Sequence, residues 1–200
     1  DAPKISSFTP RLAGFQVGAS DTPDAVVHAP FANGFGVSVV DSGVEDVFEI
    51  AANYADEIGS VDLGVDVFYV IGEFPAAGID TEEFGVGASI GFAGFTLGGA
   101  YKESENLLGG IVIAADETIW TAGLAYGTGP WTVGVAYIQS EFEGGSTILT
   151  TDFLQIGGGY SLGAGVDVGL DIQFITNEIN TLPNSNADDT SAGLVLAISF

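Results

Sequence analysis

Apolar and polar residues alternate strictly over segments of about ten residues along most of the chain. From Val166 to Phe174, every second residue is Val, Leu, Ile or Phe, and the residues between them are Asp, Gly and Gln. Val61–Ile71 and Glu83–Phe92 show the same pattern. A period of two puts the apolar residues on one face of a β-strand, whereas a helix would spread them around its axis. The pattern therefore predicts antiparallel strands that each have one apolar face.

Breaks in the alternation predict eleven strands, joined by connections of two kinds. Short connections alternate with longer ones that are acidic or rich in Asn and Gly. This order is typical of bacterial transmembrane barrels, which have short periplasmic turns and long external loops. The expected strands are residues 4–9, 13–21, 46–56, 60–72, 82–92, 94–103, 117–127, 131–142, 151–161, 165–176 and 190–200. The expected short turns are 10–13, 56–60, 92–94, 127–130 and 161–165, and the expected long connections are 22–45, 73–81, 103–116, 142–150 and 177–189. A twelfth strand at Phe35–Val40 is an alternative that would disturb the order of the turns.

Aromatic residues stand at both ends of the apolar faces. Phe84 and Phe92 share a face and are eight residues apart. At ~3.3 Å per residue and a tilt of ~40°, this spacing corresponds to about 20 Å along a barrel axis, close to the height of a membrane-embedded apolar band. Aromatic rings prefer the two membrane interfaces. The expected aromatic girdle consists of Phe84, Phe92, Phe95, Tyr101, Trp120, Tyr126, Trp131, Tyr137 and Phe200.

The opposite face carries Gly, Ser, Thr, Asp and Gln, and we expect no bulky apolar layer on it. In a soluble barrel the interior is the apolar side, so a polar interior indicates a water-filled lumen. The candidate pore-lining residues are Gln16, Glu49, Asn53, Asp62, Asp66, Lys102, Asp167, Asp171 and Gln173. Carboxylates in a confined lumen attract cations, which predicts a cation-preferring channel. Acids that only keep the wall wet are the alternative.

Composition excludes several other classes of protein. The chain of 200 residues has 27 acidic and 3 basic residues, a net charge of −24, and no cysteine, yet its mean hydropathy is +0.40. Nucleic-acid binding is not expected, because phosphate contacts need Lys and Arg. An enzyme is not expected either, since His28 is the only histidine and zinc sites or histidine relays have few candidate residues. A soluble acidic β-protein remains an alternative.

The segment from Lys4 to Gly18 resembles the Y-x-T-P-R-x-x-G-F-x-x-G stretch of Gram-negative porins, particularly those of alphaproteobacteria. The end of the chain, Leu196–Phe200, resembles the C-terminal signal that the outer-membrane assembly machinery recognises. Members of that family are outer-membrane general diffusion porins with sixteen-stranded barrels, usually trimeric. The resemblance implies that residues 1–200 form a single transmembrane domain, the C-terminal part of a longer barrel. It also implies that the inward-folded third loop of the family precedes Lys4.

The resemblance implies passive diffusion of ions and small hydrophilic solutes, with the lipid bilayer and lipopolysaccharide as partners, and no cofactor. A substrate-selective channel and a structural or adhesive barrel without an open pore are the alternatives. Clusters of acids in the expected loops are candidates for loosely bound Ca²⁺ or Mg²⁺, although solvated loop charge is the simpler interpretation. These clusters are Asp41/Glu45/Asp46, Asp80/Glu82/Glu83, Glu103/Glu105, Asp116/Glu117, Glu141/Glu143 and Asp188/Asp189.

Overall fold

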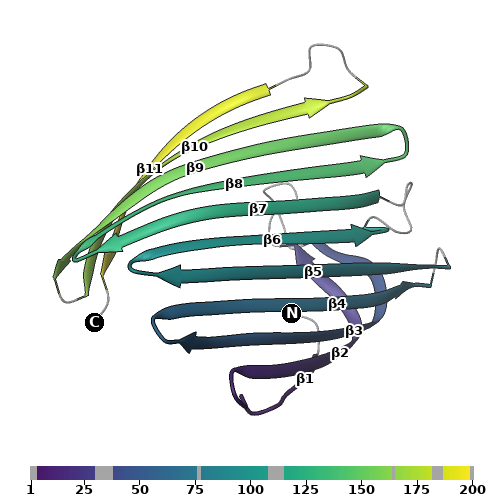
Figure 1. The fold of residues 1–200 in the computed structure, drawn as a ribbon. Coiled ribbons are helices and arrows are strands. Elements are labelled where there is room, and N and C mark those ends of the chain that lie inside the picture. The colour runs from purple at the N-terminus through teal and green to yellow at the C-terminus, as the bar shows by residue number, and fades with distance from the viewer. Residues whose placement is uncertain are drawn as a thin grey trace.

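A computed structural model of the chain describes residues 4–29, 38–75, 78–107, 115–163, 165–181 and 187–198, with the backbone alone at 24–29 and 38–43. These residues form one antiparallel sheet of eleven strands in sequence order (Figure 1). The strands are β1 (Ile5–Phe8), β2 (Phe15–Ala29), β3 (Ser38–Ile58), β4 (Val61–Phe74), β5 (Ile79–Phe92), β6 (Phe95–Glu105), β7 (Ala115–Thr128), β8 (Trp131–Gly144), β9 (Thr147–Gly163), β10 (Val166–Ile179) and β11 (Ala187–Ile198). Each strand contacts only its sequence neighbours, so β1 and β11 are the open edges of the described sheet. The predicted all-β, up-and-down fold is confirmed.

Short turns lie together at one end of the sheet, which is on the left in Figure 1. At the turn between β5 and β6, Phe92 pairs with Phe95, and both intervening residues are left-handed, with φ 52° at Ala93 and 85° at Gly94. Two left-handed residues match the twist of a two-residue hairpin. A Cβ at Gly94 would lie 2.5 Å from the carbonyl oxygen of Gly127, so this position requires glycine for its packing as well as for its backbone conformation.

The strands are longer at the other end than the sequence predicts. β8 and β9 pair up to Gly144 and Thr147, so the expected long connection 142–150 is wrong and a two-residue turn stands in its place. The expected connections 73–81, 103–116 and 177–189 are likewise shortened by strand residues. Acidic and polar residues continue the pleat there because a strand that extends beyond the apolar band exposes both of its faces to water. Ser38–Val40 belong to β3 and form no separate strand, and Phe35 lies outside the described residues.

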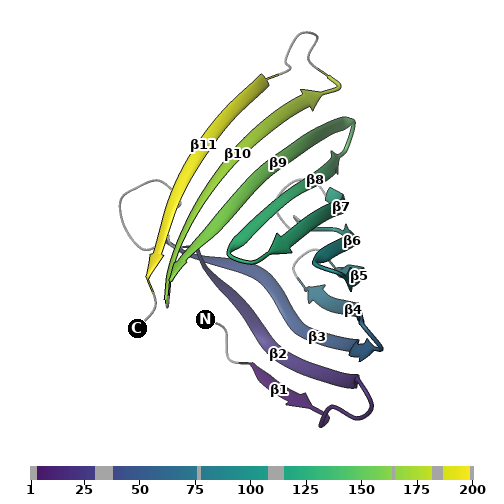
Figure 2. The ribbon, with the colours of Figure 1, turned by 60° about the vertical axis from the view of Figure 1, so that its left-hand side comes forward.

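The N-terminal part of β3, before Glu45, pairs only with the end of β2. These two segments, Asp24–Ala29 and Ser38–Val44, leave the sheet as a two-stranded ribbon. Glu45 pairs with Glu73 and Phe48 with Ile71, so two residues of β3 face one residue of β4. The first of these two, Asp46, has a φ of 50°. Such β-bulges bend a strand and increase its twist. Figures 1 and 2 agree in placing the far part of this ribbon on the concave side of the sheet, so an inward-folded segment follows Lys4 in this chain.

The sheet is curved like a trough (Figure 2), and its two faces differ in burial. In the described part of the chain, the buried side chains belong to the face that carries the polar residues and most glycines; they are Ser20, Thr22, Phe74, Ser104 and Ala115. Large exposed hydrophobic residues belong almost entirely to the opposite face, as do Val86, Leu97 and Leu170. Curvature crowds side chains on the inner face of a sheet, so the polar face is the concave one and the aliphatic face is convex.

Candidate permeation pathway

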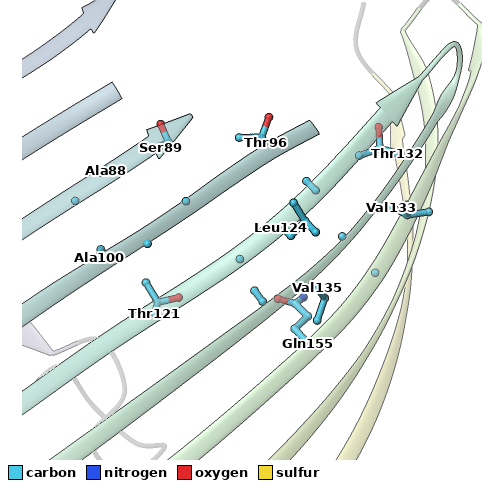
Figure 3. Close-up of a pocket in the computed structure, with 18 of the residues that line it drawn as sticks. Ala88, Ser89, Thr96, Ala100, Thr121, Leu124, Thr132, Val133, Val135 and Gln155 are labelled. Atoms are coloured by element: carbon cyan, nitrogen blue, oxygen red, sulfur yellow. The ribbon is translucent and has the colours of Figure 1, made fainter. Parts of the chain in front are cut away.

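The middle of the concave face is an open trough of about 690 Å³. Small residues from β5 to β9 form its floor, among them Ser89, Thr96, Thr121 and Thr132 (Figure 3). Asp66 lies at one side of this floor and Gln155 at the other. Because the floor consists mainly of Gly, Ala, Ser and Thr, few side chains project from it, and the trough has room for water and small solutes.

Glycines opposite the concave carboxylates let these side chains lie against the wall. Asp66 pairs with Gly87 and Asp62 with Gly91 on the neighbouring strand. A Cβ at Gly87 would lie 2.7 Å from an Asp66 carboxylate oxygen, and one at Gly91 would lie 3.1 Å from the Asp62 carboxylate. Glycine in a strand often marks such a close approach. The two carboxylates therefore add negative charge to the trough while occupying little of its width.

Lys102 reaches two carboxylates on the concave face, one on each neighbouring strand. Its Nζ lies 3.1 Å from Glu83 and 3.6 Å from Glu117. Ser104 donates a hydrogen bond to Glu83 and Ser140 donates one to Glu117, both at 3.0 Å. Glu83 and Glu117 thus hold Lys102, although neither was among the expected pore-lining residues. The alternation did place Glu83 on the same face as those residues.

Glu49, Gln16 and Asn53 hold the other two cations of the chain. Glu49 accepts hydrogen bonds from Lys4 and from Ser20. Arg11 donates to the carbonyl oxygen of Gly14 and to Asn53 Oδ1, each at 2.6 Å, and to Gln16 Oε1 at 3.2 Å. All three basic side chains of the sequence therefore have acceptors on the concave face.

The candidates on β10 form a separate group. Gln173 donates to Asp171 at 2.8 Å and accepts a hydrogen bond from Ser191 at 3.3 Å. Gln155 on β9 lies 3.5 Å from the same carboxylate. Asp167 shares their face by strand alternation and lies near the short-turn end. The nine candidates thus lie on one face but in several groups, and their role in lining a pore remains a prediction.

Aromatic rings form two belts on the convex face. Near the short turns, ring centroids of Phe95 and Tyr126 are 4.3 Å apart and those of Trp131 and Tyr160 are 4.4 Å apart. Tilted and edge-on pairs at this distance are favourable. The structure adds Phe15, Tyr54, Tyr69 and Tyr160 to the expected residues. The sequence could have indicated these four residues, because alternation places them on the apolar face near the ends of the strands. Phe200 lies outside the described residues.

The second belt, which we call the upper belt, lies near the ends of the strands opposite the short turns, and its rings have polar hydrogen-bond partners. The ring centroids of Trp120 and Tyr137 are 5.0 Å apart. Trp120 Nε1 donates to Gln139 at 3.0 Å, while Tyr137 and Gln139 both donate to Asp152. Rings with one apolar side and one hydrogen-bonded end suit the boundary between hydrocarbon and water. The function of this belt as a membrane girdle remains a prediction.

The acidic clusters expected in loops lie in strands, and strand alternation divides them between the two faces. Glu82 accepts a hydrogen bond from Tyr69 on the convex face, whereas Glu83 binds Lys102 on the concave face. Among the described residues, no group of three or more His, Cys, Asp or Glu is arranged to hold a metal ion. The side chains of His28 and Asp41 lie outside the described part.

No helix in the described part of the chain is long and apolar enough to cross a membrane. The sequence profile of a family described as Gram-negative porin matches residues 1–180. No curated protein sequence matches the chain.

Three solved structures have a similar fold. Outer-membrane expressed OmpT of Vibrio cholerae superimposes with a TM-score of 0.62 at 12% identity, over 98% of this chain and 73% of that one. The anion-selective porin from Comamonas acidovorans gives 0.58 at 14% identity, over 98% and 57%. A further porin gives 0.58 at 18% identity, over 98% and 62%. The chain thus spans less than two thirds of the last two proteins. By its family match and this fold, the chain belongs to the Gram-negative porin family and is a protein of the outer membrane.

Proposed function

We propose that this porin is a diffusion channel with an acidic, water-filled lumen that lets ions and small hydrophilic solutes pass and prefers cations. The main support is the distribution of charge on the concave face. Lys4 and Lys102 each have a carboxylate partner. Among the described residues, the concave acids Asp62, Asp66 and Asp171 form no ion pair. The excess of carboxylates would hold mobile cations in the pore.

The inward-folded ribbon of β2 and β3 would narrow this channel on the side of β4. A Cβ at Gly72 on β4 would lie 2.8 Å from Val44 Cγ1 and 3.1 Å from Val47 Cγ2. Phe74, at the end of the same strand, is only 4% exposed. The ribbon therefore packs against the concave wall where it leaves the sheet, and the trough over β5–β9 would carry the flow.

To test this function, the detergent-extracted native protein is inserted into a planar bilayer, and the reversal potential of its current is measured in a KCl gradient. The proposal predicts open-channel current and a reversal potential of the sign given by cation flow. An anion-selective current would contradict the cation preference. Persistent silence would favour a structural or adhesive barrel, and saturable conductance for a single solute would favour a substrate-selective channel.

Closure of the sheet requires further strands in this proposal. β1 and β11 both run toward the short-turn end, so they cannot pair with each other in an antiparallel barrel. An odd number of additional strands would close it, and unpaired edges are costly in hydrocarbon. This supports residues 1–200 as the C-terminal part of a single, longer barrel domain. An intact mass of 20.4 kDa for the native protein would contradict it.

The proposed surroundings follow from the two faces. Acyl chains would cover the convex face between the belts, and lipopolysaccharide would meet the acidic ends of the strands, with loosely bound Ca²⁺ or Mg²⁺ between the charges. A homotrimer is the assembly that the family resemblance implies. The proposal includes no catalytic step and no cofactor. Cross-linking of intact membranes that gives only monomers would contradict the trimer.

A further inference from the structure

An apolar patch interrupts the polar concave face at the height of the upper aromatic belt. Ile138 on β8 pairs with Phe153 on β9, which pairs with Ile175 on β10. All three lie on the concave face, because Phe153 is two positions from Gln155, which reaches Asp171 on that face, and Ile138 and Ile175 pair with Phe153. Their side chains are half-buried. A second apolar pair, Phe142 and Leu149, lies four positions further along the same strands.

The patch differs from the middle of the trough, where the concave side chains are small or polar. The apolar side chains of the patch point to the concave side. Their convex neighbours along the strands include the polar residues Gln139 and Asp152, which are hydrogen-bonded to each other, and the apolar residues Tyr137, Leu154 and Phe174. In the described part of the chain, the backbone of the β2–β3 ribbon makes no close contact with β8, β9 or β10. Exposed apolar area in water is unfavourable by ~25 cal/mol per Å², so an apolar group that passes through the trough would gain from contact here.

One carboxylate borders the patch, and another borders the second apolar pair. Asp189 on β11 pairs with Ile175, and Glu117 on β7 pairs with Phe142. Paired residues on the same face have Cβ atoms about 5 Å apart, so a carboxylate and an apolar surface are within reach of one small molecule. The cation on this side, Lys102, is already held by Glu83 and Glu117. An apolar surface edged by acids is complementary to an organic cation and not to an organic anion.

We infer that this patch is a docking site for organic cations with an apolar body, such as aryl- or alkylammonium ions, on their way through the pore. The ring or chain lies over Ile175 and Phe153, and the ammonium group faces Asp189. The inference rests on the proposed function, since it gives the diffusion channel a preferred class of solute. It does not extend to a solute with two charged ends, because the described patch has apolar side chains at its centre.

Block of the KCl current through native protein in planar bilayers tests this site. Phenylethylammonium and ethylammonium carry the same charge but differ in apolar area. We expect half-block by phenylethylammonium at a concentration about tenfold lower than by ethylammonium, as expected for ~60 Å² of additional apolar contact. Ile175→Thr should raise the half-blocking concentration of phenylethylammonium about fivefold, as expected for the loss of ~40 Å² of that contact. Asp189→Asn should raise it about threefold, and affect ethylammonium equally, through the lost charge.

Two matched variants serve as controls. Ile175→Val keeps the apolar surface. Asp188→Asn removes the neighbouring acid, and strand alternation places the side chain of Asp188 on the convex face. Phenylethylammonium should block both variants at the same concentration as the native protein. Normal KCl conductance of every variant shows that it is folded. A bilayer that stays silent in KCl contradicts the channel itself. Open current that both amines block equally, or block that Ile175→Thr and Asp189→Asn leave unchanged, overturns the docking site while the channel stands.

Discussion

Replacement of Ala88 with Arg is expected to lower the free energy of unfolding by about 2–4 kcal/mol, the cost of a basic residue at the middle of the lipid-facing wall of a barrel. Ala88 lies on the convex face of β5, midway between Phe84 and Phe92. Its cross-strand neighbours are Val65 and Gly99, and neither of them can accept a hydrogen bond through its side chain. The guanidinium group would therefore enter hydrocarbon without a partner.

Ala100→Arg is the matched control for this substitution. Ala100 lies on the adjacent strand β6, two positions from Lys102 and on the same concave face, so the same side chain would extend into water. We expect a change below about 1 kcal/mol. Urea titrations in lipid vesicles, followed by the fluorescence of Trp120 and Trp131, give both values. Equal destabilisation by the two arginines would contradict the assignment of the faces.

Replacement of Asp62 and Asp66 together with Asn is expected to reduce the ratio of cation to anion permeability by about twofold to fivefold. This is the change produced if the two carboxylates lower the energy of a cation in the pore by ~0.5–1 kcal/mol. Asparagine keeps the shape that fits over Gly87 and Gly91, so the width of the trough should not change. The reversal potential in a KCl gradient gives the ratio before and after substitution.

Convex acids provide the comparison for the double variant. Glu82 and Glu103 accept hydrogen bonds from Tyr69 and Tyr101 on the convex face, and Glu82→Gln with Glu103→Gln removes the same charge from the protein. We expect little change in selectivity, because these groups face away from the trough and salt screens them. If both double variants shift the reversal potential equally, total charge and not the concave wall controls selectivity.

The sequence was sufficient for the sheet and for the orientation of most side chains. From Val61 to Val67 the alternation is unbroken, and β4 follows it. At the long end of the strands the same reasoning failed. Gly144, Gly145 and Ser146 have the composition of a loop, yet β8 and β9 pair to within a two-residue turn. Composition reports solvent exposure, and it does not distinguish a loop from a paired strand that is wet on both faces.

Pairing between distant residues was beyond sequence reasoning for a different reason. Lys102 was expected to face the pore, but its partners Glu83 and Glu117 depend on the register of three strands. The concave apolar patch was missed because Phe153 and Leu154 are adjacent apolar residues, and because the alternation of Val166–Phe174 ends just before Ile175. Where two neighbours are both apolar, a period of two assigns neither to a face. The expectation that the concave face lacks bulky apolar side chains is therefore wrong at this end of the sheet.

The most direct test of the central claim uses single cysteines along β10, since residues 1–200 contain none. Cysteine at Asp167, Gly169 and Asp171 in turn, and separately at Val168, Leu170 and Ile172, would be treated in intact membranes with a water-soluble thiol reagent. The first set should be labelled and the second protected, because the first faces solvent and the second faces acyl chains. Labelling of Val168, Leu170 and Ile172 with protection of the aspartate positions would contradict the account.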